Sequence, residues 1–206
     1  MKLIGSLTSP YVRKIRVMLL EKNLPFDLVI DSPWEPSTHV SDFNPLGKVP
    51  ALVTDEGETL FDSNILAEYI ELLDVAPPHA PKFLPADRAA ALRIRQLVML
   101  ADGIADAGVA VFLEIKRPVD HQDANWLARQ HGKILRGLAA LESRASASTW
   151  LAGEEMSLAD IALGCVLLWL DIRVSTLKWR DDHPALSRLV ATLSARPSFQ
   201  NTIPPA

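Results

Sequence analysis

Three short stretches in the first third of the chain combine residue types that can bind or activate a small polar ligand. The first reads Ser9-Pro10-Tyr11-Val12 at a predicted strand-to-helix turn. It has the layout of a redox Cys-Pro-Tyr-Cys motif with both sulfurs replaced, so the protein itself cannot carry out thiol–disulfide exchange there. What remains is a hydroxyl at a helix start, where free N–H groups and the helix dipole favour an anion, such as the thiolate of a ligand.

A plainer interpretation is that Ser9 only caps the helix, which is the commoner role of a serine before a proline-started helix. Thr8 offers a second hydroxyl that could serve instead of Ser9. The basic residues Arg13, Lys14 and Arg16 oppose the helix dipole but add positive potential, and Arg13 is expected to help lower the pKa of a docked thiol.

The second stretch, Asn44-Pro45-Leu46-Gly47-Lys48-Val49-Pro50, leads into a predicted buried strand over 51–54. Pro50 has no N–H for a strand ladder. The Val49-Pro50 bond is a candidate cis peptide, since only an X–Pro bond adopts cis at a cost of about 0.5–1 kcal/mol. A cis bond would turn the N–H and C=O of Val49 toward an extended, peptide-like ligand. An ordinary trans proline at a strand start is the alternative.

The third stretch, Asp62-Ser63, stands at the start of another predicted helix. A hydroxyl and several free N–H groups suit a carboxylate, and the Asp62 carboxylate suits an ammonium group. One end of an amino acid carries both groups. The alternative is again a plain helix cap.

The elements around these stretches predict a small α/β fold. Strands over 3–5 and 26–30 flank a helix over 10–22, which makes a parallel βαβ unit. A polar loop with a short helix over 31–42 follows, then strands over 51–54 and 59–61 joined by a turn, and a helix from Asp62 or Ser63. The order βαβαββα closes a four-stranded mixed sheet with helices on its faces.

The rest of the chain carries only helical patterns. Prolines 77, 78, 81 and 85 mark a linker, so we expect domains over 1–76 and 86–206 joined by 77–85. Predicted helices cover 87–114, 126–145 and 184–195. Ser157-Leu158-Ala159-Asp160 looks like a capping box that opens a further, very apolar helix. The fold class is therefore α/β followed by an all-α bundle.

Composition limits the function classes. The 206 residues are 49% hydrophobic and 22% charged, with a net charge of -4, which argues against nucleic acid as a main partner. We expect no membrane span, because no uninterrupted apolar run reaches about 18 residues, and a cytoplasmic location, because the start lacks a signal-peptide pattern. A single Cys165 excludes an internal disulfide. The five histidines lack metal-ligand spacing, so we expect no metal.

Taken in order, the motifs resemble the cytosolic glutathione S-transferase family, as a bacterial serine-type member. The resemblance covers essentially the whole chain, with Trp150-Leu151-Ala152-Gly153 and the following capping box matching a structural signature of the second domain. It implies a thioredoxin-like first domain that binds glutathione as co-substrate. The residues that it implicates are Ser9 as catalytic, Val49 and Pro50 at the cysteinyl backbone, Asp62 and Ser63 at the γ-glutamyl end, and Lys48 at a carboxylate or backbone.

The resemblance implies activation of the glutathione thiolate for attack on a small electrophile, with a role in detoxification. Ser9 would donate a hydrogen bond to the sulfur anion, because an unassisted serine is too weak a base to remove its proton. His39 and Trp34 are further candidates for the glycyl carboxylate. A homodimer is expected, with plausible interface residues near Leu66 and Met99. The rivals are a non-catalytic binding protein, as in stress- or transcription-associated relatives, and a glutathione-dependent isomerase or dehalogenase.

Overall fold

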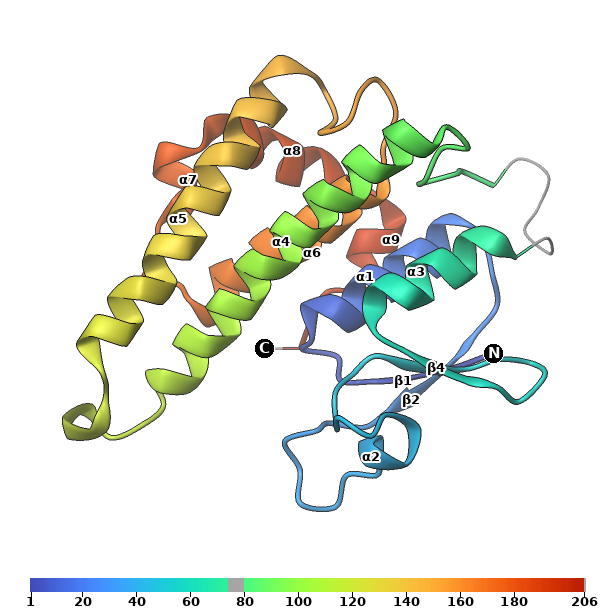
Figure 1. Cartoon of the computed structure of the whole chain (residues 1–206), viewed down its shortest axis with the longest axis horizontal. Coiled ribbons are helices and arrows are strands. Elements are labelled where there is room, and N and C mark those ends of the chain that lie inside the picture. The colour runs from blue at the N-terminus through green and yellow to red at the C-terminus, as the bar shows by residue number, and fades with distance from the viewer. Residues whose placement is uncertain (74–79, 206) are drawn as a thin grey trace. The chain divides into compact units, whose positions relative to one another are not determined.

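The computed structural model describes residues 1–73 and 80–205, which fall into two units (Figure 1). The first unit comprises Met1–Phe83 and Ala195–Ala206, and the second comprises Leu84–Ser194. We had predicted that all of 86–206 belongs to the second domain. The C-terminal residues pack instead with the first unit, because Phe199 and Thr202 are buried against its first helix. The predicted linker over 77–85 lies partly outside the described residues.

The first unit is built on a four-stranded mixed sheet with the order β2-β1-β3-β4. β1 (Lys2–Gly5) pairs with β2 (Asp27–Ile30) in parallel and with β3 (Ala51–Val53) antiparallel, and β3 pairs antiparallel with β4 (Thr59–Phe61). The predicted order βαβαββα and the mixed sheet are confirmed.

Two longer helices cover one face of this sheet, and a short helix covers the other (Figure 1). α1 (Pro10–Glu21) and α3 (Ser63–Leu72) lie side by side, and α2 (Val40–Phe43) lies opposite them. Side chains alternate across a strand, so successive residues of β1 serve different layers. Ile4 packs with Val40 and Ala51 in a small core beside α2. The first unit buries further apolar side chains, among them Leu3, Val12, Ile15, Met18, Leu52, Leu66 and Ile70.

A short helix, α9 (Pro197–Gln200), follows the helical unit and packs on α1 within the first unit. Arg196 precedes it and Pro197 occupies its first turn, which suits a residue with no N–H to satisfy. We had predicted Arg196-Pro197 only as the end of the preceding helix. The proline does end that helix, and it also starts the next one.

The second unit is a bundle of helices, as predicted. Its three long members are α4 (Arg88–Glu114), α5 (Ala124–Ala147) and α6 (Leu158–Arg173), and α4 contacts both of the others. The remaining elements are a 3-10 turn (Val119–His121), α7 (Trp179–Asp182) and α8 (Pro184–Ser194). Gly137 of α5 allows the closest approach, since a Cβ there would lie 2.7 Å from Ile104.

The α4 helix is long and apolar enough, by length and composition, to pass as a membrane span. The core helix of a bundle meets the same test, and Ile94, Val98, Ala101 and Ile104 of α4 are buried within the second unit. Its apolar character is therefore explained by packing against α5 and α6.

The predicted capping box is present at the start of α6. The Asp160 carboxylate accepts hydrogen bonds from the backbone N–H and the hydroxyl of Ser157, at 2.8 and 2.7 Å, and from the N–H of Leu151 at 2.8 Å. Burial raises the pKa of Asp160, although these hydrogen bonds act in the opposite direction. The box holds the loop from Leu151 against the start of a helix that is buried nearly all round.

Candidate functional site

The register of the sheet brings the three predicted stretches to one end of it. Ile4 lies opposite Ala51, and Ala51 lies opposite Phe61. The chain leaves β1 toward Ser9, enters β3 from Pro50, and leaves β4 toward Asp62. Since these strands are neighbours with β3 antiparallel to both others, all three connections emerge at the same end of the sheet.

Ser9 is the N-cap of α1, and the Val12 N–H donates to its hydroxyl oxygen at 3.3 Å. The plainer role considered for Ser9 is thus present. The hydroxyl oxygen acts as an acceptor in this bond, so its own proton stays available as a donor. The cap and a hydrogen bond to a ligand anion are therefore compatible.

Ser6 and Thr8 form a hydroxyl pair just before Ser9, with their oxygens 3.0 Å apart. The Ser9 N–H also donates to the Ser6 carbonyl at 3.2 Å, which closes the turn between β1 and α1. Sequence reasoning did not single out Ser6. The signal was present, since serine and threonine hydroxyls two residues apart often organise such turns.

The Val49-Pro50 bond is cis in the structure, which decides between the cis and trans alternatives considered from the sequence. The Val49 side chain packs beside the small core of Ile4, Val40 and Ala51, while its backbone precedes the ladder that begins at Ala51. Pro50 is buried. The side chain of Val49 is thus held by packing, while its backbone N–H and C=O lie outside the β3–β4 pairing.

Asn44 shapes the loop that leads to Val49, a role that sequence reasoning missed. Its side chain donates to the Lys48 carbonyl at 2.8 Å and accepts from the Leu46 N–H at 3.0 Å, and Asn44 is buried. Gly47 has φ of 61°, which favours glycine. The Asn-Pro-Leu-Gly sequence carries the signal, because asparagine and glycine at these places are typical of a turn.

Asp62 caps α3 with a backbone in the left-handed region, at φ 73° and ψ 125°. Its carboxylate accepts from the Asn64 N–H at 2.8 Å. A non-glycine residue in this conformation costs about 1–3 kcal/mol and is found disproportionately at functional sites. Asp62 is exposed and Ser63 is buried in the first turn. The exposed carboxylate of Asp62 therefore lies next to Ser63, the first residue of α3.

The basic side chains of α1 have partners within the first unit. Arg13 donates to the Phe199 carbonyl at 3.0 Å and to the Thr202 hydroxyl at 3.2 Å, and Lys14 donates to the Asn64 side chain at 3.0 Å. Arg16 donates to the Asn201 carbonyl at 3.3 Å. We expected Arg13 to act on the thiol. Arg13 is instead 4% exposed, and its guanidinium is hydrogen-bonded to the C-terminal segment.

The candidates for a ligand carboxylate lie on exposed positions. Lys48, His39 and Trp34 are all exposed. The loop before α2 is held by Asp31, whose carboxylate accepts from the Thr38 hydroxyl at 2.7 Å and from the His39 N–H at 2.9 Å. The hydrogen bond from Thr38, followed by that from His39, lowers the pKa of Asp31. The hydrogen bond from its N–H to Asp31 therefore fixes the backbone of His39.

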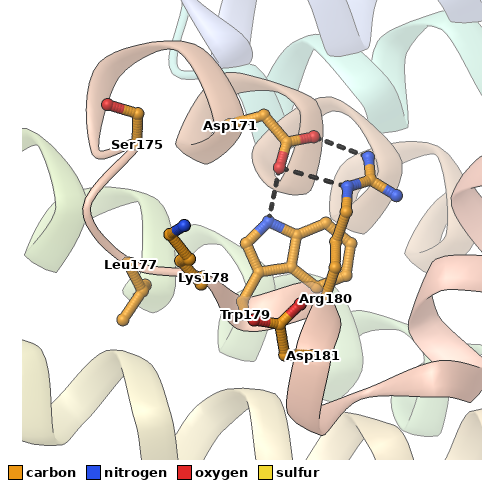
Figure 2. Close-up of a pocket in the computed structure, with 7 residues that line it drawn as sticks. All are labelled: Asp171, Ser175, Leu177, Lys178, Trp179, Arg180 and Asp181. Carbon is orange, nitrogen blue, oxygen red and sulfur yellow. Dashed lines mark hydrogen bonds and ion pairs between the residues drawn. The ribbon is translucent and has the colours of Figure 1, made fainter.

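A hollow of about 230 Å³ in the second unit has no residue in common with the predicted site (Figure 2). Asp171 accepts hydrogen bonds from the Trp179 indole at 2.8 Å and from Arg180 at 2.6 Å. These polar side chains of the hollow are therefore already hydrogen-bonded to one another. The described residues hold no group of three His, Cys, Asp or Glu side chains that could hold a metal ion. The sheet end of the first unit remains the candidate site. The hollow is lined by Asp171, Ser175, Leu177, Lys178, Trp179, Arg180 and Asp181.

The sheet end offers an anion site, a cation site and backbone groups for an extended chain. The starts of α1 and α3 favour negative charge, and the Asp62 carboxylate favours an ammonium group. A ligand that carries a peptide backbone, an amino-acid end and an anionic sulfur has matching groups for each of them.

Two family models match the chain, and both describe glutathione S-transferases. The N-terminal domain model matches residues 8–73, and the C-terminal domain model matches residues 101–197. The GST-like protein YibF of Escherichia coli strain K12, itself described as uncharacterized, is 46% identical over 205 residues, covering 100% of this chain and 99% of YibF. The chain belongs to the glutathione S-transferase family. The family confirms the thioredoxin-like first domain and the helical second one.

One solved structure shows a similar protein with a glutathione derivative bound. A glutathione S-transferase from Methylobacterium radiotolerans, in complex with glutathione sulfonate, superposes with a TM-score of 0.92 at 41% identity. The match covers 100% of this chain and 95% of that one. The similarity thus extends over both units of this family member.

A different kind of relative matches over part of its length. Elongation factor 1-gamma of Danio rerio is 34% identical over 161 residues, which is 77% of this chain but only 34% of that protein. The family architecture therefore also occurs as one segment of a larger protein that is named for a role in translation.

Proposed function

We propose that this protein is a glutathione transferase that binds glutathione at the sheet end of the first unit and activates its thiol. The observation that carries the proposal is the register, which places the connections to Ser9, Pro50 and Asp62 at one end of neighbouring strands. The glutathione sulfonate complex of the Methylobacterium relative supports the same ligand class.

In this proposal, each end of the tripeptide meets a different stretch. The backbone of Val49, before Pro50, pairs with the cysteinyl residue. Ser63 and the start of α3 receive the γ-glutamyl carboxylate, and the Asp62 carboxylate receives the ammonium group. Lys48 contacts the glycyl carboxylate or the backbone, with His39 and Trp34 as alternative contacts.

Ser9 is the proposed catalytic residue. Its hydroxyl donates to the glutathione sulfur, and the free N–H groups at the start of α1 favour the thiolate over the thiol. Each pKa unit by which the thiol is lowered corresponds to about 1.4 kcal/mol of preference for the thiolate. The thiolate attacks a small electrophile, its sulfur forms the new bond, and the leaving group or adduct takes up the electron pair.

Calorimetry and ultraviolet spectroscopy test the proposal on the full chain. We expect heat of glutathione binding and a thiolate absorbance band at neutral pH, together with conjugation of a model electrophile. Binding without turnover of any electrophile would favour a non-catalytic binding protein, for which the elongation factor relatives are the supporting observation. Absence of binding would refute the proposal.

Product analysis separates transfer from the other glutathione-dependent reactions. A transferase consumes glutathione and releases a thioether. An isomerase returns glutathione unchanged, and a dehalogenase releases halide. The substrate screen should therefore monitor free thiol, substrate isomers and halide in parallel.

We also propose a homodimer and a cytoplasmic location. Leu66, near which we predicted an interface, is itself fully buried, whereas its neighbour Ile65 is 54% exposed and Met99 is 58% exposed. The homodimer is proposed from the resemblance to the family, and Ile65 and Met99 are the exposed apolar positions chosen to test it. Light scattering during gel filtration tests the pairing, and charged substitutions at Ile65 and Met99 should give the monomer.

A further inference from the structure

The C-terminal residues 196–202, which we call the C-terminal strap, run along α1 and bind it at several points. Arg196 and Ser198 contact Glu21 at the last residue of α1, and Asn201 contacts Arg16 in the middle. Phe199 and Thr202 contact Arg13 near the start of the helix. The contacts join residues 175 to 189 positions apart in the sequence.

The contact with Arg13 is the buried one. Arg13 is 4% exposed, Phe199 is 1% exposed and Thr202 is fully buried. The guanidinium donates to the Phe199 carbonyl and the Thr202 hydroxyl, and it lies 5.6 Å from the centre of the Phe199 ring. Burying a guanidinium costs folding free energy unless its N–H groups are hydrogen-bonded. The contacts with Phe199 and Thr202 therefore favour one position of Arg13 on the helix.

Arg13 belongs to the same turn as Ser9. The Arg13 N–H donates to the Ser9 carbonyl at 3.0 Å, and the Val12 N–H donates to the Ser9 hydroxyl at 3.3 Å. A shift of the Arg13 backbone therefore disturbs the hydrogen bond to the Ser9 carbonyl and, through the neighbouring Val12, the hydrogen bond to the Ser9 hydroxyl.

We infer that the C-terminal strap positions the first turn of α1, and with it Ser9, through the contact of Thr202 with Arg13. The inference deepens the proposed function and rests on it for the catalytic consequence. Thr202 and Arg13 are positioning residues, because they act on the ligand through the turn that carries Ser9.

Two variants of the strap form a matched pair for the test. Thr202→Val removes the hydroxyl that faces Arg13, and Ser198→Ala removes the hydroxyl that faces Glu21 at the other end of α1. Both residues are buried, and each variant deletes one hydroxyl from the same segment. Thr202→Val also loses the hydrogen bond from the Thr202 hydroxyl to the Ser198 carbonyl at 2.8 Å, so the test reads where along α1 exchange changes. A strap that only adds overall stability would change exchange uniformly along α1 in both variants.

Hydrogen exchange of the unliganded protein gives the first readout. We expect Thr202→Val to speed exchange of the Val12 and Arg13 amides by about tenfold relative to Ser198→Ala, because local opening becomes easier there. Thr202→Ser, which keeps the hydroxyl, should restore the slow exchange. Equal exchange in the two deletion variants would overturn the inference.

Kinetics with glutathione give the second readout. We expect Thr202→Val to lower kcat/KM by about threefold to tenfold and to shift the pH profile of thiolate formation upward, with Ser198→Ala close to wild type. An unchanged pH profile in Thr202→Val would overturn the catalytic part. The two proposals fail differently, since a wild-type protein that binds no glutathione refutes the function, whereas the exchange data test the positioning without any ligand.

Discussion

Gly5 at the end of β1 lies so close to Val12 of α1 that a Cβ atom on Gly5 would stand 2.6 Å from Val12 Cγ2. Real Cβ contacts are longer, so only glycine allows the strand and the helix to meet at this distance. Val12 is also the residue whose N–H donates to Ser9. The close approach therefore fixes the turn on which the proposed catalytic residue stands.

Gly5→Ala should destabilise the protein by about 1–3 kcal/mol, because the added methyl overpacks a buried site. Urea unfolding measures the change. Gly103→Ala is the control, since a Cβ there meets nothing within 4 Å, and alanine in an exposed helical position should stabilise by up to about 1 kcal/mol. Adding Val12→Ala to Gly5→Ala should recover part of the loss, and strictly additive effects would contradict the proposed clash.

Ser9→Ala should lower kcat/KM for conjugation by about tenfold or more, which corresponds to about 1.4 kcal/mol of lost transition-state stabilisation. The same variant loses a helix cap, at about 0.5–2 kcal/mol of stability, so assays belong well below its melting temperature. Thr8→Val tests the alternative hydroxyl, and turnover close to wild type is expected because the Thr8 hydroxyl pairs with Ser6. Unchanged turnover in Ser9→Ala would remove Ser9 from the mechanism.

Asp62→Asn should weaken glutathione binding by about tenfold while the protein stays folded. Asparagine keeps a side-chain oxygen for the Asn64 N–H and tolerates positive φ, so the variant mainly removes the charge that faces the ammonium group. Asp42→Asn removes an exposed carboxylate elsewhere in the unit and should bind as wild type. Equal affinities in calorimetry would exclude Asp62 from the γ-glutamyl site.

His183→Leu should stabilise the protein by about 1 kcal/mol. The imidazole is 8% exposed, and neither of its nitrogens has a hydrogen-bond partner among the described residues. A buried polar group without a partner costs about 1–3 kcal/mol, which an apolar side chain avoids. Thermal unfolding measures the gain, with His121→Leu as an exposed control expected within about 0.5 kcal/mol of wild type. A loss of stability would instead indicate a buried water bound to His183.

Glu21→Gln should flatten the loss of stability in acid. Burial raises the pKa of Glu21, but hydrogen bonds from Arg196 and Ser198 and the charge of Arg196 outweigh it, so the pKa falls below its ordinary 4.5. The carboxylate therefore stabilises the fold above pH 4.5, and the contribution is lost as the pH falls through the lowered pKa. Urea unfolding between pH 3 and 7 checks this, with the exposed Glu56→Gln as control. If the free energy of unfolding changed with pH in the same way in wild type and Glu21→Gln, the stabilising role of the Glu21 carboxylate would be contradicted.

Most of the first unit was predictable because its signals are local. The N-cap Ser9 and the helix start at Pro10 follow from residue types within a few positions. The same local signals narrowed the cap of α3 to Asp62 or Ser63 and marked Val49-Pro50 as a candidate cis bond. Loop chemistry was harder, since the contacts of Asn44 and Ser6 depend on how their loops close.

Long-range contacts explain what the sequence could not predict. Arg13 was expected near the ligand because a helix start is rich in positive potential, yet its partners lie 186 and 189 residues away. The same contacts place the chain end in the first unit and not in the helical one. An interface was predicted near Leu66, but only the packing of α3 shows that Ile65 is the exposed apolar residue there.

The C-terminal strap also sets the order in which the protein can be completed during translation. A ribosome releases the chain from its N-terminus, so β1 to α3 emerge before the helical unit, and the residues that bind Arg13 and Glu21 emerge after it. The whole helical unit has been synthesised by then. The first helix of a nascent first unit consequently gains its contacts with the C-terminal strap only after the intervening helical unit has been made.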